Sequence, residues 1–202
     1  MSDVKPLVLD VDGTFLRTDM LLESFWSALG TDFFGTLRVC VRCLGSRARL
    51  KRELAEIAAL RTDLLPVNPQ IAALAARSKK AGRVVLLASG SDQSLVKSLA
   101  RHHGLEGDIL ASDGVTNLTG RKKADTLVAL FGEGGFDYAG NSRTDIPVWH
   151  AAENAIIVGR HPGIAADLSR RAGNVEEFGG GFSFRSTALT RPAAARQRRL
   201  AS

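Results

Sequence analysis

The sequence Pro6-Leu7-Val8-Leu9-Asp10-Val11-Asp12-Gly13-Thr14 places a short apolar run directly before two aspartates and a glycine. In an extended strand alternate side chains point the same way, so Asp10 and Asp12 lie on one side of the backbone. Gly13 then permits a sharp turn. Because open α/β sheets bind ligands at the carboxyl ends of their strands, this stretch predicts such a sheet with two acids at its ligand-binding edge.

The two neighbouring carboxylates favour phosphoryl chemistry. They repel each other and any phosphate, so a divalent cation between them is expected, and Mg²⁺ is the natural occupant. With the metal in place, one aspartate can attack phosphorus while the other gives a proton to the leaving oxygen. The alternative is a strand that ends in a polar turn, because Asp and Gly are common turn residues.

The length and composition indicate a globular protein. The 202 residues are 45% hydrophobic, which is enough to bury the core of one domain together with a modest insertion. No run approaches the roughly 18 apolar residues that span a bilayer, and the first residues lack a secretory apolar region. A cytoplasmic location is therefore expected.

Positive charge is unevenly distributed along the chain. The net charge is +6, and arginines and lysines crowd two stretches, Arg38, Arg42, Arg47, Arg49, Lys51 and Arg52 in one, and Arg185, Arg191, Arg196, Arg198 and Arg199 in the other. Such clusters suit an anionic membrane surface, a phosphorylated substrate or nucleic acid, although a solvated basic face is the commoner meaning. Nucleic acid is not expected as a partner, because no nucleic-acid fold or interleaved aromatic platform accompanies the charge.

The two cysteines, Cys40 and Cys43, stand about one helical turn apart. A zinc site normally needs four ligands, and the chain has no second cysteine pair. Buried thiols in a helix are therefore favoured over a metal or redox function.

Apolar spacing divides the chain into a helical block and an alternating region. Residues 19–60 show a helical period, broken by Gly30 and Gly45 into helices that include 33–44 and 47–60. The following pattern alternates, with Asn68 as the N-cap of the next helix and Pro69 in its first turn. Strands are expected at 83–88, 108–111, 136–139 and 155–158, and helices at 92–103, 122–131 and 145–152.

Repeated βα units of this length predict a doubly wound, mostly parallel, Rossmann-like sheet with helices on both faces. The core is expected to comprise residues 1–18 and 66–178, with 19–65 as a helical insertion over the strand ends. Residues 179–202, which contain no acid, are expected to form a flexible basic tail.

Polar residues follow three further strands or begin the next helix. Ser89 and Gly90 follow the second strand, where Ser89 could bind a phosphoryl oxygen or, equally, serve in capping or turn formation. Ser91 is expected to cap the next helix. Lys123 lies near a helix N-terminus, where a cation is disfavoured unless an anion shares the site, although an exposed lysine pair is the commoner reading. Asn141 and Asp145 follow a later strand and offer oxygens to a metal, or Asp145 is a helix N-terminal charge.

In their order and their common location at strand ends, these segments resemble the four motifs of the haloacid dehalogenase (HAD) superfamily, over about residues 6–165. Residues 10–14 match the first motif, Ser89 the second, Lys123 the third and residues 140–145 the fourth. The resemblance implies a HAD-like fold with a small helical C1-type cap, and Mg²⁺-dependent hydrolysis of phosphomonoesters through an aspartyl-phosphate. A closer resemblance is to the phosphatase-like domain ahead of UbiA-type membrane prenyltransferases, carried by residues 111–118, 136–142 and 145–149.

The resemblance implies a role for each matched residue. Asp10 is the nucleophile, Asp12 the general acid, and Lys123 a catalytic cation. Substrate would be bound by Ser89, Gly90 and Thr14, and Mg²⁺ by Asp10, Asp12, Asp145 and Asn141.

The implied substrate is a small or lipid-linked phosphorylated metabolite, and the implied partners include an anionic membrane surface or a membrane prenyltransferase. Asn141 stands where the family usually has aspartate, so weaker Mg²⁺ binding is expected. The alternative is a catalytically weak binding or regulatory module associated with prenyl-lipid metabolism.

Overall fold

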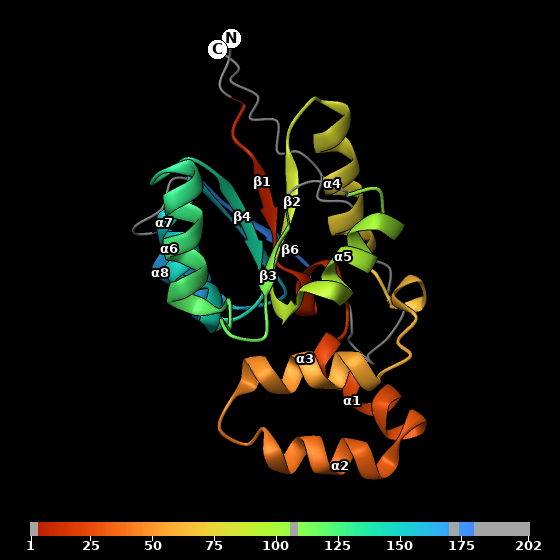
Figure 1. Cartoon of the computed structure of the whole chain (residues 1–202). Coiled ribbons are helices and arrows are strands. Elements are labelled where there is room, and N and C mark those ends of the chain that lie inside the picture. The colour runs from red at the N-terminus through yellow and green to blue at the C-terminus, as the bar shows by residue number, and fades with distance from the viewer. Residues whose placement is uncertain (1–3, 106–108, 170–173, 180–202) are drawn as a thin grey trace, which may run out of the picture.

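The computed structural model describes residues 4–105, 109–169 and 174–179. Its centre is one six-stranded sheet in the order β3-β2-β1-β4-β5-β6, and every pairing between these strands is parallel (Figure 1). The strands are β1 (Leu7–Leu9), β2 (Val85–Asp92), β3 (Leu110–Ser112), β4 (Asp137–Gly140), β5 (Asn154–Val158) and β6 (Asn174–Phe178). Because the chain first extends the sheet to one side of β1 and then to the other, the ligand-binding crevice of such a sheet lies at the end of β1.

Strand β1 packs into both faces of the sheet although it is only three residues long. Leu7 and Leu9 belong to one buried cluster, and Val8 belongs to the other. This division follows from the alternation of side chains along a strand. All three residues are fully buried, which explains why the sequence is apolar without interruption there.

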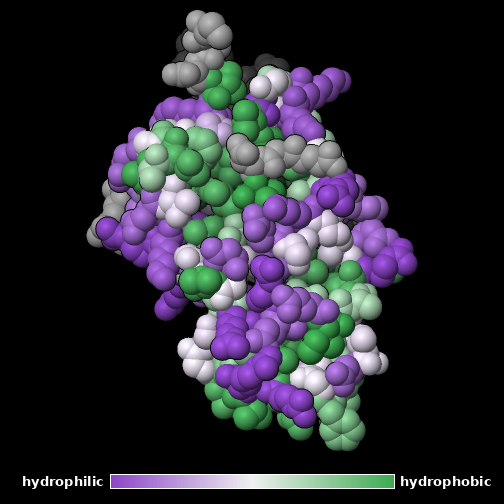
Figure 2. Space-filling view, viewed as in Figure 1, coloured by the Kyte–Doolittle hydropathy of each residue, from purple (hydrophilic) through white to green (hydrophobic). Residues whose placement is uncertain are grey.

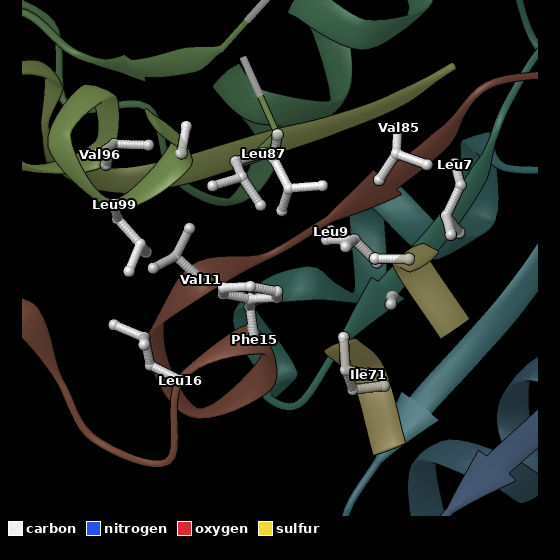
Figure 3. Packing of buried hydrophobic residues seen from close by; sticks show 14 of the residues in the cluster. Leu7, Leu9, Val11, Phe15, Leu16, Ile71, Val85, Leu87, Val96 and Leu99 are labelled. Atoms are coloured by element: carbon white, nitrogen blue, oxygen red, sulfur yellow. The ribbon is translucent and has the colours of Figure 1, made fainter. Parts of the chain in front are cut away.

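One face of the sheet is covered by α4 (Pro69–Lys80) and α5 (Gln93–His102), and the other by α6 (Gly120–Phe131), α7 (Ile146–Ala151) and α8 (Pro162–Leu168). Figure 3 shows the first cluster, in which Leu9 and Phe15 gather with Ile71 of α4. The second cluster contains Tyr138 and Trp149, two of the largest fully buried side chains. The two layers hold β1 rigidly between them.

Three helices between β1 and α4 form a separate unit beyond the carboxyl ends of the strands (Figure 1). They are α1 (Met20–Thr31), α2 (Phe33–Arg42) and α3 (Arg47–Ile57), and we call them the cap. The cap has its own small apolar cluster around Ala28, Val39, Cys43 and Leu54. The chain enters and leaves the cap through two neighbouring segments, which are joined by an isolated antiparallel bridge between Leu16 and Val67.

The structure confirms each helix and strand expected from the sequence, with ends displaced by a few residues. The expected pattern omitted α8 and β6. Strand β6 is a polar edge strand with exposed residues, so it lacks the apolar run that marks the inner strands. The expected basic tail lies outside the described residues, except Gly179. Within the described ranges, no helix is both long and apolar enough to cross a membrane.

Candidate active site

A cavity of about 350 Å³ opens between the strand ends and the cap. Its walls come from the ends of β1, β2 and β4, from the start of α6, and from α3 of the cap. Its polar lining includes Asp10, Asp12, Lys51, Gly90, Ser91, Lys123, Asn141 and Asp145. Side chains that are distant in the sequence therefore meet at the edge predicted for ligand binding.

Asp10 follows β1 directly and is held on two sides. Lys123 Nζ donates a 2.7 Å hydrogen bond to Asp10 Oδ1, and Thr14 Oγ1 donates one of 3.2 Å to Oδ2. Thr14 can reach back because the chain turns tightly after Asp12, with Gly13 at φ +75°. The carboxylate is thus fixed in orientation at the wall of the cavity.

Burial and charge set the protonation of this pair. Burial raises the pKa of Asp10 to about 7, in opposition to Lys123, and the negative charges of Asp145 and Asp12 push in the same direction as burial. Burial disfavours the charge of Lys123, but Asp10 and Asp145 raise its pKa overall. The site therefore has one buried ammonium, that of Lys123, beside the three carboxyl groups of Asp10, Asp12 and Asp145.

The side chain of Asp12 is supported by the cap and by β2. Met20 N donates 2.7 Å to Asp12 Oδ1, while Ser91 Oγ donates 2.7 Å and Ser89 Oγ 3.3 Å to Oδ2. Burial raises the pKa of Asp12, although these hydrogen bonds oppose the shift. A carboxyl group with a raised pKa and a fixed orientation suits proton transfer.

The prediction that Ser91 caps the next helix was wrong. Helix α5 begins at Gln93, and its N-cap is Asp92, whose side chain accepts from Ser94 N. Strand β2 extends as far as Asp92, so Ser91 is still in the strand and its hydroxyl points to Asp12. Ser91 is therefore a site residue that the capping argument missed.

Asp145 is buried and lies behind Asp10. Its Oδ1 accepts a 2.8 Å hydrogen bond from Tyr138 Oη and lies 3.8 Å from Lys123 Nζ, while Oδ2 accepts from Asn141 N and from Ser142 N and Oγ. Lys123 also donates 3.0 Å to Tyr138 Oη. Burial and the neighbouring carboxylates raise the pKa of Tyr138 well above its usual value, so it stays a neutral donor.

Asn141 lies over the turn that carries Asp12. A Cβ atom placed on Gly13 would lie only 2.0 Å from Asn141 Nδ2. The close approach therefore requires glycine at position 13 as well as the positive φ angle. Asn141 also lines the cavity beside Asp10 and Asp145.

The cap contributes a lysine that the sequence reading placed only in a basic surface. Lys51 Nζ donates 2.6 Å to the main-chain oxygen of Gly90 and 3.1 Å to Asn117 Oδ1. Burial lowers the pKa of Lys51. The main-chain oxygen of Gly90 also accepts from Ser112 Oγ, so this strand end is fixed from the cap and from β3.

The structure brings the predicted site residues together around one cavity, with Thr14 and Ser89 held behind the acids they contact. Sequence reasoning missed Tyr138 and Ser91 as partners of the acids, and it missed Lys51 as a residue of the cavity wall. Tyr138 stands two residues before Gly140 on β4. Its place in the strand that leads to the fourth motif could have indicated that it lies near the site. Lys51 gave no comparable signal, because the helical pattern of α3 indicates only that position 51 is polar.

The oxygen donors at the cavity fit a magnesium ion. Among the described residues, no three His, Cys, Asp or Glu side chains are grouped as metal ligands. Mg²⁺ is commonly held by one or two carboxylates with waters and phosphate oxygens, however, and does not require such a group. Asp10, Asp145 and the amide of Asn141 line the cavity and carry hard oxygens of this kind, and the family resemblance adds the main-chain carbonyl of Asp12. Burial raises the pKa of Asp10, and the negative charges of Asp145 and Asp12 add to that shift, so a cation at this site would offset charge that Lys123 does not balance.

Comparison with solved structures shows which fold this is. A HAD family hydrolase from Salmonella enterica serovar Typhi superposes with a TM-score of 0.59 at 15% identity, covering 88% of this chain and 70% of that one. A phospho-aspartyl intermediate analogue of phosphoserine phosphatase gives a TM-score of 0.53 at 14% identity, covering 85% and 92% of the two chains. The fold is that of the HAD hydrolases.

Sequence comparison adds one relative to these HAD-fold structures. The "Uncharacterized protein y4nM" of Sinorhizobium fredii (strain NBRC 101917 / NGR234) is 34% identical over 171 residues, which is 85% of this chain. The chain spans only about a third of that protein, 33% of its length. No family model matches the chain.

Proposed function

We propose that this protein hydrolyses phosphomonoesters through an aspartyl-phosphate formed on Asp10. The observation that carries the proposal is the placement of the Asp10 carboxylate, 2.7 Å from the ammonium of Lys123 in a cavity that also holds Asp12. A nucleophile, a charge-neutralising cation and a proton donor are the parts that such a reaction needs. The phospho-aspartyl analogue with the same fold is consistent with this chemistry.

In the first half-reaction, an oxygen of Asp10 attacks phosphorus and the bond from phosphorus to the ester oxygen breaks. Asp12, whose pKa is raised by burial, gives its proton to the departing alkoxide. Lys123 offsets charge on the transferring phosphoryl group. The hydroxyl of Ser89 is buried and donates to Asp12, so it supports the acid rather than the phosphoryl group.

In the second half-reaction, Asp12 is a carboxylate and takes a proton from water. The hydroxide attacks the phosphorus of the aspartyl-phosphate, which releases inorganic phosphate and restores Asp10. The three donors that hold Asp12, Met20 N, Ser91 Oγ and Ser89 Oγ, stabilise its charged form during this interval.

Magnesium would be held by Asp10, the main-chain carbonyl of Asp12, Asn141 and Asp145. When bound, it supplies positive charge that draws the phosphate toward the carboxylates and lowers the pKa of Asp10. Asn141 offers a neutral oxygen, so we expect the ion to be held less tightly than by an additional carboxylate.

The test is turnover of p-nitrophenyl phosphate in the presence of Mg²⁺. Asp10→Asn removes the nucleophile while keeping an oxygen for Lys123, and should abolish phosphate release. Asp125→Asn, an exposed aspartate on α6 that pairs with Arg121, is the matched control and should retain it. Wild-type turnover in the purified Asp10→Asn protein would contradict the proposal.

The second candidate function is a binding or regulatory module with weak turnover, and Asn141 is the observation that favours it. The retained Asp10, Asp12 and Lys123 geometry favours catalysis instead. Phosphate release from a panel of phosphomonoesters separates the two. A module would bind them without Mg²⁺-dependent release.

We also propose that the cap contacts an anionic membrane surface on the cytoplasmic side. Such a location would suit association with a UbiA-type prenyltransferase, which the sequence resemblance implies. Large apolar residues on α1, on α2 and in the turn after α2 are each at least 54% exposed. We call them the outer cap face, namely Trp26, Phe33, Phe34, Leu37, Val41 and Leu44. Figure 2 shows apolar residues gathered at the end of the molecule farthest from the sheet. Arg38 is exposed on α2, and its positive charge would complement anionic lipid headgroups.

Vesicle sedimentation tests the membrane proposal. The protein should sediment with vesicles that contain phosphatidylserine and less with phosphatidylcholine alone. The double variant Phe34→Ser with Leu44→Ser should lose binding, whereas Val115→Ser, on an equally exposed residue of the core domain, should keep it. Failure of the wild-type protein to sediment with either vesicle would remove the proposal.

A further inference from the structure

A second cavity of about 400 Å³ lies within the cap and adjoins the catalytic one. We call it the cap groove, and it is lined by Asp19, Leu21, Leu22, Phe25, Cys40, Leu50 and Leu54. Asp19 and Leu21 line both cavities. The two spaces are therefore neighbours at the start of α1, and the catalytic one also contains Asp10 and Asp12.

The two adjoining cavities differ sharply in chemistry. The catalytic cavity is lined by aspartates, lysines, amides and hydroxyls, whereas the cap groove is lined by aliphatic, aromatic and thiol groups. Asp19 is the exception, and its Oδ1 is already engaged as the N-cap of α1, where it accepts from Leu22 N. The groove thus offers little to a polar ligand and favours a hydrocarbon.

The groove is preformed by packing in the cap. Leu54 is buried in the cap cluster, and Phe25 and Leu50 pack against that cluster from the side. Leu22 is 52% exposed, so it forms an open rim rather than part of the packed interior. A ligand chain can therefore cover Leu22 without displacing the residues that hold the cap together.

We infer that the substrate is a phosphomonoester whose leaving group carries an aliphatic chain, with the phosphate beside Asp10 and Lys123 and the chain in the cap groove. This inference rests on the proposed function, because it assigns the phosphate to the reacting end. A charged cavity and an apolar cavity that share the lining residues Asp19 and Leu21 suit the two ends of such an amphiphile. A free inorganic phosphate or a short polar ester would leave the groove empty.

The expected effect is a strong dependence on chain length. Burial of one methylene group favours binding by about 0.8 kcal/mol, which corresponds to roughly a fourfold gain in affinity. Octyl phosphate has six more methylenes than ethyl phosphate, and the groove is open on one side, so a gain of at least about a hundredfold in kcat/KM is expected.

Binding without turnover is measured with octylphosphonate and ethylphosphonate, whose carbon–phosphorus bonds are not hydrolysed by phosphate ester chemistry. The indole of Trp26 provides a fluorescence signal, because it packs edge-on against Phe25 with ring centroids 5.2 Å apart. Calorimetric titration gives the same affinities without a fluorophore. Octylphosphonate should bind far more tightly than ethylphosphonate, and octanol should bind more weakly than octylphosphonate.

A pair of variants locates the chain. Leu22→Gln makes the rim of the groove polar and should reduce the octyl-to-ethyl preference at least fivefold. Leu130→Gln, at a similarly exposed leucine on α6, is the matched control and should leave the preference intact. Both positions are partly exposed on helices, so both variants are expected to fold.

The outcomes distinguish this inference from the proposed function. If short and long esters are hydrolysed equally well, the groove is not a substrate site and the phosphatase proposal still stands. If no ester is hydrolysed but octylphosphonate binds tightly and Leu22→Gln weakens it, the amphiphile site stands and the phosphatase proposal fails. Equal affinity for octanol and octylphosphonate would overturn the inference, because the phosphate would then play no part.

Discussion

Lys51 Nζ lies 2.6 Å from the main-chain oxygen of Gly90, and this hydrogen bond joins α3 of the cap to the end of β2. The same ammonium donates to Asn117 Oδ1 at 3.1 Å, so one side chain ties two strand-end segments to the cap. Because Lys51 also lines the catalytic cavity, it places positive charge where an anionic substrate enters. The position of the cap and the electrostatics of the cavity are thus linked.

Lys51→Met should weaken substrate binding more than it slows the chemical step. The variant keeps the length of the side chain but removes its charge and both hydrogen bonds. Loss of one charged contact to the substrate should lower the affinity for the substrate about tenfold. Steady-state kinetics with p-nitrophenyl phosphate should show a higher KM and a smaller change in kcat. Lys97→Met, at an exposed lysine of α5, should behave as wild type. An unchanged KM for Lys51→Met would show that the contact is only structural.

The adjacent lysines Lys122 and Lys123 offer a test of catalysis. Lys123 is buried against Asp10, whereas Lys122 is exposed on the same helix. Lys123→Met should lower kcat by about a hundredfold to a thousandfold, because charge on the transferring phosphoryl group is no longer offset. Lys122→Met should keep kcat within about twofold of the wild-type value, because an exposed charge on the protein surface contributes little. Circular dichroism of both proteins checks that the difference does not arise from unfolding, and equal activities would contradict the role given to Lys123.

Asn141→Asp should tighten magnesium binding. The substitution adds one negative charge beside Asp10 and Asp145, so the Mg²⁺ concentration for half-maximal activity should fall about tenfold. In metal-free protein the same charge adds repulsion and should lower the melting temperature. Mg²⁺ should therefore raise the melting temperature of the variant more than that of wild type. Gln70→Glu, an exposed change on α4, should show neither effect, and the proposal for Asn141 fails if the two variants respond alike.

The stability of the metal-free protein should fall as pH rises from about 4 to about 7. In this range folded Asp10, with a pKa of about 7, keeps a proton that the unfolded chain, with a pKa of 3.8, has lost. At about 1.4 kcal/mol per pKa unit, the free energy of unfolding should decrease by a few kcal/mol. Urea denaturation at pH 5 and pH 8, with chelator present, measures this change.

Asp10→Asn provides the control for the pH experiment. The variant should flatten most of the pH dependence, and it should be more stable than wild type at pH 8. Part of the slope should remain, because burial also raises the pKa of Asp12. An equal slope in the two proteins would mean that Asp10 is not the titrating group.

The sheet and the location of the site could be predicted from the sequence because local signals coincided. Leu7–Leu9 is apolar on both faces, which indicates a strand buried from two sides, and the two aspartates follow it at once. Asn68 and Pro69 signalled the start of α4 through capping chemistry, and the structure confirms both roles. The fourth-motif residues similarly stand between a clear strand and a clear helix.

The remaining parts depend on contacts that a linear pattern does not encode. Lys51 reaches Gly90 across 39 positions of sequence and looks in its own helix like any solvated lysine. The role of Ser91 was missed because capping propensity is a local rule, whereas its hydroxyl donates to Asp12 in the turn after β1. Strand β6 was missed because an edge strand need not be apolar.

The closeness of Asn141 Nδ2 to Gly13 ties the variation of the two positions together. A larger residue at position 13 would need the side chain at 141 to shorten or turn away first, and its backbone would still be strained at a φ of +75°. The order in which the two changes arise therefore affects whether intermediates survive. Libraries that randomise the first-motif loop alone should consequently return glycine at 13, whereas libraries that vary both positions can sample new pairs.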